Sequence, residues 1–179
     1  MKYSNLSINM YLNKLAAKAP TPGGGSSAAV FGAMGCALLE MVINYSNKNT
    51  KTIKNSGIVL KKYRIRFLHL LEDDIRVYKK LSSVCKNNKN NSKIIQISLK
   101  KAALVPLDTC AFSYAGVKLC NRLKTQVNKN LISDLGCAKE AFVCAFNSAK
   151  LNVDINLKYI KDKAFVNLTR KKLKKWRRF

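Results

Sequence analysis

Apolar residues recur every three to four positions along most of the chain, which is the spacing of helices that bury one face. Strand-like alternation is scarce, and the best strand candidate, residues 93–99, runs directly into sequence with helical spacing. We therefore predict an all-α protein, a single-domain, up-and-down helical bundle of five to seven helices. No repeat or linker divides the chain, so one domain is expected over 1–179, with a basic C-terminal tail at 166–179. The predicted helices cover residues 10–15, 26–46, 54–84, 93–124, 138–153 and 156–176.

Several features interrupt this helical pattern. A proline and three glycines at 21–25 are expected to separate the first two helices. The polar stretch 86–92 and the stretch 126–132 indicate connections between helices. Pro106 lies inside the fourth predicted helix and should kink or split it, because proline lacks the N–H that helix bonding requires. Ser133 is the expected N-cap of the next helix.

The charge balance is the most unusual feature of the composition. Lys and Arg number 34 against nine Asp and Glu, a formal net charge of +25 at pH 7, and 47% of the residues are hydrophobic. That hydrophobic content excludes a disordered polycation and indicates a globular protein. Of the basic residues, 27 are Lys and seven are Arg, whereas base reading and bidentate phosphate binding favour Arg. The charge is therefore weak evidence for nucleic-acid binding, and no nucleic-acid partner is expected.

Cysteine usage and the N-terminus favour a cytoplasmic protein. The six cysteines contain no C-x-x-C pair and the single histidine, His69, is far in sequence from any two of them, so a zinc site is not expected. Residues 1–13 lack the charged and apolar regions of a secretion signal. The apolar run 25–44 is slightly short for a bilayer and contains Glu40, so we interpret it as a buried central helix and expect no membrane association.

The segment Pro22-Gly23-Gly24-Gly25-Ser26 is the first candidate binding site. Its glycines permit backbone conformations that other residues avoid, and they leave their N–H groups uncovered. They lead into a helix N-terminus, where unpaired N–H groups and the helix dipole favour anions or developing negative charge. The segment is neither a Walker A loop nor a dinucleotide fingerprint. Taken alone, a helix-breaking turn is the simpler interpretation.

Nine acidic residues in so basic a chain make each carboxylate informative. Glu72, Asp73 and Asp74 are consecutive in a predicted helix, where successive side chains point about 100° apart, so they cannot share one task. Asp74 lies four residues from both Leu70 and Tyr78, which belong to the apolar face of the helix predicted at 54–84. Its side chain should therefore point toward the interior. A buried carboxylate has a raised pKa and can act as general base or acid near neutral pH. A solvated acidic turn paired with nearby basic residues is equally compatible with the spacing.

Other polar positions also have two interpretations. Asp134 follows Ser133 near a helix start, where both are expected simply as cap and dipole partner. Glu40 is either a paired core carboxylate or part of a site. The basic run 170–178 could lie on phosphates or anionic lipid, but a solvated terminal helix is the simpler interpretation.

Several ordered elements together resemble the formiminotransferase-cyclodeaminase/methenyltetrahydrofolate cyclohydrolase family. The resemblance covers about residues 5–165, and Pro106 falls where that family tends to carry a mid-helix proline. The matching stretches are Ala19-Pro20-Thr21-Pro22-Gly23-Gly24-Gly25-Ser26, Gly32-Ala33-Met34-Gly35-Cys36-Ala37-Leu38, Leu70-Leu71-Glu72-Asp73-Asp74, Ser133-Asp134-Leu135-Gly136-Cys137-Ala138 and Asn152-Val153-Asp154-Ile155-Asn156-Leu157.

The resemblance implies a homodimeric enzyme of tetrahydrofolate one-carbon chemistry, with no metal or redox cofactor and a substrate groove completed by the second subunit. Chains of this length look most like the cyclohydrolase, which hydrates 5,10-methenyltetrahydrofolate to 10-formyltetrahydrofolate. The sister activity, the cyclodeaminase, closes 5-formiminotetrahydrofolate and releases ammonia. Folates carry anionic glutamate tails, sometimes several, and the positive field of this chain would attract them.

The same resemblance implies roles for individual residues. Asp74 matches the last acidic position of the family's acidic helix and is the first candidate for the base that later acts as acid. Glu72 is a second candidate for the proton transfer. Asp134 would orient substrate or share the transfer, with Ser133 hydrogen-bonding nearby. The segment from Pro22 to Ser26 would bind substrate, with glycine N–H groups against the pterin or the one-carbon oxygen.

A different class of function stays open beside the enzyme. A catalytically weakened copy of the same fold could serve as a basic helical protein that binds nucleic acid or an anionic surface through the run 170–178. Nothing in the sequence decides between cyclohydrolase and cyclodeaminase.

Overall fold

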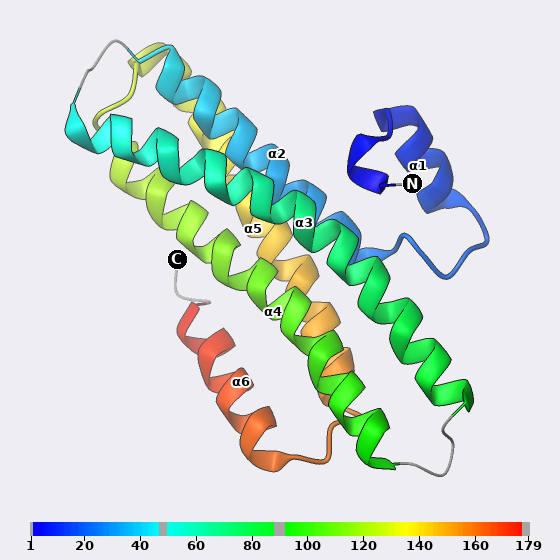
Figure 1. Ribbon diagram of the computed structural model, residues 1–179. Helices are drawn as coiled ribbons and strands as arrows, with labels where there is room; N and C mark the ends of the chain where they lie inside the picture. Colours follow the sequence, from blue (N-terminus) through cyan, green and yellow to red (C-terminus); the bar gives the residue numbers. More distant parts are fainter. Residues whose placement is uncertain (1, 47–49, 88–91, 177–179) are drawn as a thin grey trace.

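The structure, a computed structural model, describes residues 2–46, 50–87 and 92–176, and it contains no strand within them. Six α-helices and two short 3-10 helices make up its regular structure (Figure 1), which confirms the predicted all-α class and helix number. The α-helices are α1 (Ile8–Ala16), α2 (Gly24–Asn44), α3 (Lys51–Asn87), α4 (Ser92–Leu123), α5 (Ile132–Leu157) and α6 (Lys163–Trp176), and the 3-10 helices are η1 (Tyr3–Asn5) and η2 (Lys129–Leu131).

Helices α2 to α5 form an up-and-down bundle in which successive helices run in opposite directions (Figure 1). Each of the four packs on its two neighbours, with α2 against α3 and α5, and α4 against the same two helices. Helix α1 lies beside the bundle near the start of α2, and α6 lies along the outer side of α4 (Figure 1). The predicted architecture is therefore confirmed for the described residues.

Small residues on α2 allow neighbouring helices to pack closely against it. Gly32 faces the ring of Phe67 on α3, where a Cβ would come within 2.6 Å of ring carbon Cδ1. Gly35 of α2 and Gly116 of α4 both face the ring of Phe142 on α5. Both phenylalanines are fully buried. The glycines therefore make room for two large rings at the centre of the bundle, where close packing gives the greatest burial of apolar area.

Helix α2 is long and apolar enough to cross a membrane by length and composition, the one such helix among the described residues. It packs against α3, α4 and α5, which agrees with the interpretation of a central helix. Glu40 forms a bidentate pair with Arg64, with Nε–Oε1 at 2.8 Å and Nη2–Oε2 at 3.2 Å, so of the two interpretations the paired carboxylate holds. Five apolar side chains along α2 have no exposed surface: Ala28, Ala29, Cys36, Leu39 and Val42.

Some helix boundaries differ from prediction. Helix α2 begins at Gly24, two residues before the predicted start, because glycine is tolerated in a first turn whose N–H groups are unpaired. Helix α4 continues through Pro106 without a break, so of the two predicted effects, a kink or a split, the split does not occur. Helix α5 begins at Ile132 with Leu131 as its N-cap, which places Ser133 inside the first turn instead of at the cap.

The later connections also fall elsewhere than predicted. The break after α5 lies at residues 158–162 instead of near 154–155. Of the polar connection predicted at 86–92, residues 88–91 lie outside the described part of the chain. All six cysteines are free, and three of them, Cys36, Cys110 and Cys120, are buried, whereas the others are exposed.

The basic C-terminal segment is a docked helix over its described length. Leu173 of α6 is buried, and the ring of Trp176 stacks on Tyr114 of α4 at 6.4 Å between centroids. The lysines and the arginine of α6 are exposed, the amphipathic pattern expected for a terminal helix that covers a core edge. Residues 177–179, the end of the predicted tail, lie outside the described residues.

Candidate active site

A pocket forms where α2 stops short of its neighbours. Helix α2 has 21 residues and α3 has 37, so at the usual rise α2 is about 31 Å long and α3 about 55 Å. Beyond the first residues of α2, the connection from α1 takes the place of a fourth helix and leaves a cavity of about 320 Å³. Its lining residues are Pro20, Thr21, Gly23, Gly24, Gly25, Asp74, Val77, Tyr78, Leu81, Ala102, Asn152, Ile155 and Asn156.

The glycine segment shapes this pocket because its residues carry no side chains, which lets α3 approach the first turn of α2 closely. No described glycine has a positive φ, and Gly23 is extended at φ −151°, so the expected role in unusual backbone conformations is wrong. A Cβ on Gly25 would instead lie 2.6 Å from Cγ and 2.8 Å from Oδ2 of Asp74. The glycine is needed because the carboxyl group of α3 presses against the first turn of α2.

Ser26 holds the start of α2 and is itself fully buried. Its Oγ accepts the N–H of Gly23 at 2.9 Å and donates to the carbonyl of Gly23 at 2.8 Å. Its backbone N–H donates to the carboxyl group of Asp74. Ser26 and the buried Pro22 therefore support the pocket from behind, whereas the three glycines line it.

Asp74 is the one charged side chain among the described residues that line the pocket. Burial raises the pKa of Asp74 to about 6, because the apolar surroundings disfavour the ionised form, and the hydrogen bond from the Ser26 N–H opposes that rise only in part. A carboxyl group with a pKa near neutrality can exchange a proton with a ligand at physiological pH. The structure thus places the first catalytic candidate in a cavity with a suitable pKa.

The two preceding acids point elsewhere, as the helical spacing predicts. Oε1 of Glu72 accepts the backbone N–H of Ser4 at 2.8 Å, which ties the N-terminal segment to α3. Glu72 does not line the pocket. A role for Glu72 in proton transfer would therefore require a rearrangement that breaks this bond.

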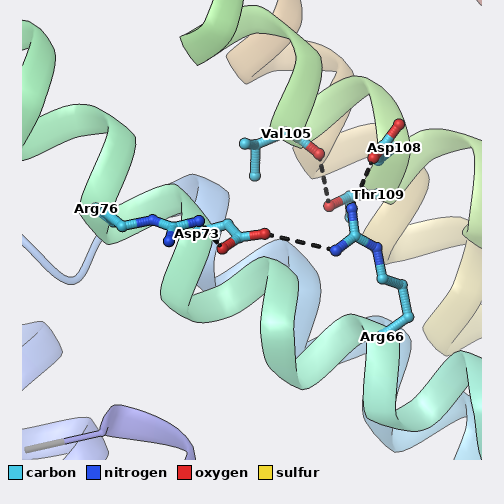
Figure 2. A network of polar contacts seen from close by, with 6 residues as sticks. All are labelled: Arg66, Asp73, Arg76, Val105, Asp108 and Thr109. Atoms are coloured by element: carbon cyan, nitrogen blue, oxygen red, sulfur yellow. Dashed lines mark hydrogen bonds and ion pairs between the residues drawn. The ribbon is translucent and has the colours of Figure 1, made fainter.

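Asp73 belongs to a charged network on the outer side of α3 and α4 (Figure 2). Its carboxylate lies 2.6 Å from Nη2 of Arg76 and 3.5 Å from Nη1 of Arg66, and Arg66 continues to Asp108 of α4 at 2.9 Å. These partly exposed pairs connect two helices, and each is expected to contribute little on its own. The solvated-pair interpretation of the acidic triplet thus holds for Asp73 but not for Asp74.

Two asparagines, which the sequence analysis did not propose as site residues, form the opposite wall. Nδ2 of Asn152 donates to the carbonyl of Ser148 at 2.9 Å, and Nδ2 of Asn156 donates to the carbonyl of Ala102 at 3.2 Å. Their i, i+4 spacing places them on one face of α5, which is the signal that could have indicated a paired site. With both amide nitrogens donating to helix carbonyls, each amide presents its oxygen as an acceptor.

Ser133 and Asp134 are not brought to this pocket within one chain. Helices α2 and α5 are antiparallel, since Gly24 faces Asn152 and Gly35 faces the region of Ala138. Asp134 precedes Asn152 by 18 residues on the same helix, so it lies about 27 Å away along α5. Both residues occupy the first turn of α5, where Asp134 interacts favourably with the helix dipole.

A second, shallower groove adjoins the pocket on the outer side of α3. It is lined by Pro20 and Tyr78, which it shares with the pocket, together with Lys79, Ser82, Ser83, Lys86 and Asn87. Its volume is about 320 Å³, and its charged groups are both cations. The site as a whole therefore combines a carboxyl group that can transfer a proton and hydrogen-bonding groups in the cavity with an adjoining groove that carries two lysines.

The described residues contain no group of three His, Cys, Asp or Glu side chains placed to hold a metal ion. The pocket itself supplies one carboxyl group, two amides and backbone N–H groups between apolar side chains. Such a set suits the binding of a planar polar heterocycle and the movement of a proton to or from it.

Known proteins share both the sequence and the fold of this chain. A family model described as formiminotransferase-cyclodeaminase matches residues 7–175. A methenyltetrahydrofolate cyclohydrolase from Methylorubrum extorquens is 34% identical, over 94% of this chain and 88% of that protein. A formimidoyltransferase-cyclodeaminase from Rattus norvegicus is 26% identical over 93% of this chain, which spans 33% of that longer protein. The crystal structure of a formiminotetrahydrofolate cyclodeaminase from Thermotoga maritima superposes with a TM-score of 0.89 at 31% identity, covering 97% of this chain and 89% of that one.

Proposed function

Because the chain belongs to the formiminotransferase-cyclodeaminase family, we propose that it is a methenyltetrahydrofolate cyclohydrolase, which hydrates 5,10-methenyltetrahydrofolate to 10-formyltetrahydrofolate. The observation that carries the proposal is the position of Asp74, a half-buried carboxyl group with a pKa near 6 in the pocket beside the glycine segment. The similarity to a cyclohydrolase, 34% identical over 88% of that protein, supports this activity, and the match to a cyclodeaminase chain, 31% identical over 89% of it, supports the family's other activity as the second candidate.

The first half of the proposed reaction is the addition of water. The methenyl carbon bridges two nitrogens in a cationic, amidinium-type group, so it is electrophilic and attracts a carboxylate. Ionised Asp74 accepts a proton from the attacking water as the new C–O bond forms. The positive charge of the substrate stabilises the ionised carboxylate during binding, which favours the base form at neutral pH.

The second half is the collapse of the hydrated adduct. The bond between the former methenyl carbon and N5 breaks, N5 receives the proton held by Asp74, and the hydroxyl group loses its proton as the formyl C=O forms. One proton is released for each turnover, because the cationic substrate yields a neutral formyl group. The N–H groups of Gly24 and Gly25, in the first turn of α2 where helical acceptors are lacking, lie on the pocket wall and can bind the developing oxygen.

No metal or redox cofactor enters this proposal. Hydration of an amidinium group requires proton transfer and orientation, and the residues lining the pocket offer groups for both. The cyclodeaminase reaction of the relatives needs the same two functions, since N10 must lose a proton and the departing ammonia must gain one. It is therefore the second candidate activity, and release of ammonia from 5-formiminotetrahydrofolate distinguishes it.

Purified protein tests the proposal through the absorbance decay of 5,10-methenyltetrahydrofolate. The wild type is expected to accelerate the decay above the buffer rate, and Asp74→Asn to lower kcat by about 10²- to 10⁴-fold, the usual contribution of general acid–base catalysis. Asp73→Asn is the matched control, because it changes the adjacent carboxylate outside the pocket and should retain most of the activity. A wild type no faster than buffer would refute the activity, and an unaffected Asp74→Asn would remove Asp74 from the mechanism.

We further propose that the protein is a homodimer that associates through the outer face of α2. Phe31 and Met34 are 36% and 56% exposed there, and no charged side chain interrupts them, because Glu40 turns aside to Arg64. Large apolar side chains exposed three positions apart on one helix face suit an interface with another protein surface.

Such a dimer could also bring the separated site residues together. With two α2 helices antiparallel across a two-fold axis near Phe31, the far end of one bundle approaches the pocket of the other. The partner subunit's Asp134 would then lie near Gly23, and the groove would be completed by both chains. This arrangement is the proposed reason why Asp134 lies far from Asp74 in a single chain.

Light scattering tests the dimer at micromolar concentration. The wild type should have twice the mass of the chain, and Met34→Glu should dissociate it, because a carboxylate would be buried in an apolar interface. Leu104→Glu is the matched control, since Leu104 is similarly exposed on α4, across the bundle from α2. A monomeric wild type would contradict the shared groove.

The cationic groove beside the pocket is the proposed site of the folate glutamate tail. Lys79 and Lys86 can pair with successive tail carboxylates, and the shared residue Tyr78 makes the groove continuous with the pocket. A triglutamate substrate should therefore have a lower KM than the monoglutamate, with the preference lost in Lys79→Gln/Lys86→Gln and kept in the control Lys80→Gln. An equal KM for both substrates in the wild type would refute the tail site.

The free state of all six cysteines supports a cytoplasmic location.

A further inference from the structure

Helix α4 carries a proline in its interior, where the missing N–H removes one helical hydrogen bond. Pro106 is buried in the middle of a 32-residue helix that continues unbroken on both sides of it. Residue 106 would ordinarily donate its N–H to the carbonyl of Ala102, four residues earlier, but proline has no N–H. The carbonyl of Ala102 is therefore left without its helical partner.

A side chain of the pocket occupies this freed carbonyl. Nδ2 of Asn156, on α5, donates to the oxygen of Ala102 at 3.2 Å. Both residues line the pocket, so the bond lies at the wall of the site. The missing N–H of Pro106 thus provides the acceptor that sets the orientation of a pocket amide on another helix.

This orientation decides what the amide offers to a ligand. When the nitrogen of Asn156 is committed to Ala102, the oxygen Oδ1 is the end of the amide available to the pocket. A fixed acceptor complements a ring that presents N–H groups, and the reduced pterin of a folate presents its 2-amino group and N3–H. An amide free to rotate would instead present either end and bind such a ring less well.

We propose that Pro106 is a positioning residue of the pocket: by freeing the Ala102 carbonyl it fixes the Asn156 amide, whose oxygen accepts a hydrogen bond from the N–H groups of the substrate ring. The inference rests on the proposed folate substrate and adds to it the residues that recognise the pterin edge. Asn156 contacts the ligand, whereas Pro106 acts only through it.

A double-mutant cycle tests the connection in the full-length chain. The variants are Pro106→Ala, which restores an N–H for Ala102, Asn156→Ala, which removes the acceptor, and the combination of the two. Leu104→Ala, exposed on the same helix, is the control for a change in α4 away from the pocket. KM and kcat are measured with 5,10-methenyltetrahydrofolate, and Kd is measured by calorimetry with 5-formyltetrahydrofolate as a stable probe.

Both single variants should raise KM and Kd, by about 3- to 10-fold for Asn156→Ala and by no more than that for Pro106→Ala, the range of one neutral hydrogen bond. The kcat should change little, because the bond is made equally in the ground and transition states. The double variant should match Asn156→Ala alone, because Pro106 has no effect once its partner is absent. Leu104→Ala should behave as wild type.

Other outcomes separate this inference from the proposed function. Additive losses in the double variant, or unchanged KM and Kd in Pro106→Ala beside an active wild type, would overturn the role of Pro106 and leave the activity standing. A wild type that binds the probe without turning over substrate would refute the proposed activity, and the Kd cycle would still decide the role of Pro106. A wild type that neither binds nor turns over would refute both.

Discussion

Replacing Asp74 by Asn should stabilise the protein while it lowers the proposed activity by about 10²- to 10⁴-fold. Asn has nearly the same shape, and its Oδ1 can keep the hydrogen bond from the Ser26 N–H. What the substitution removes is the ionised charge in an environment that disfavours it. Residues that serve a reaction at the expense of the fold are expected at active sites.

The size and sign of the effect follow from the pKa of Asp74, which burial raises from 3.8 to about 6. The unfolded chain loses this proton at lower pH than the folded protein, so wild-type stability falls as pH rises from about 4 to about 6 and is constant above that. A pKa difference of about 2.2 units between the folded and unfolded states lowers the free energy of unfolding by about 3 kcal/mol at pH 8. At pH 5 the same effect lowers it by about 1.5 kcal/mol. Asp74→Asn should therefore gain about 3 kcal/mol at pH 8 and about half of that at pH 5.

Urea unfolding followed by circular dichroism at pH 5, 6.5 and 8 measures this, with all samples at one protein concentration so that any dimer contributes equally. Asp73→Asn serves as the control, because it removes a carboxylate that is paired with Arg76 and Arg66 and should gain no stability at any pH. An Asp74→Asn protein less stable than wild type at pH 8, or a difference that does not change between pH 5 and 8, would refute the argument that burial governs this carboxyl group.

Three further predictions concern the same pocket and the packing behind it. In the wild type, kcat/KM should fall about tenfold per pH unit below about pH 6 and level off above it, because protonated Asp74 cannot act as base; a profile flat down to pH 5 would contradict this. Gly25→Ala should lower kcat by about 100-fold, since its Cβ would lie 2.6 Å from Cγ of Asp74 and displace the carboxyl group, and an unchanged kcat would show that the close approach is unimportant. Gly136→Ala should stabilise α5 by about 0.5–1 kcal/mol in thermal unfolding, because no atom lies within 4 Å of the added methyl group. The same change at Gly116 should instead destabilise by about 1–3 kcal/mol, because it meets the ring of Phe142 at 2.6 Å, and equal effects at the two glycines would refute the packing argument.

The helices could be predicted from the sequence because helix formation depends on local spacing. The inward tilt of Asp74 followed from its distance of four residues from Leu70 and Tyr78, and the separate directions of Glu72 and Asp73 followed from the helical repeat. These expectations need only one helix and its own apolar stripe. They hold because the apolar face of α3 is buried in the core, whichever helix packs against it.

Properties that depend on two distant segments could not be obtained in this way. The need for glycine at position 25 comes from Asp74, which lies 49 residues later, and not from the backbone conformation of the glycine segment. The link between Pro106 and Asn156 spans 50 residues, and the distance between Asp134 and the pocket depends on the antiparallel packing of α5 on α2. Periodicity tells which face of each helix is buried, but it carries no information on which residue of another helix will stand opposite. That register is set by the packing of side chains in three dimensions, and it is the register that assembles the pocket.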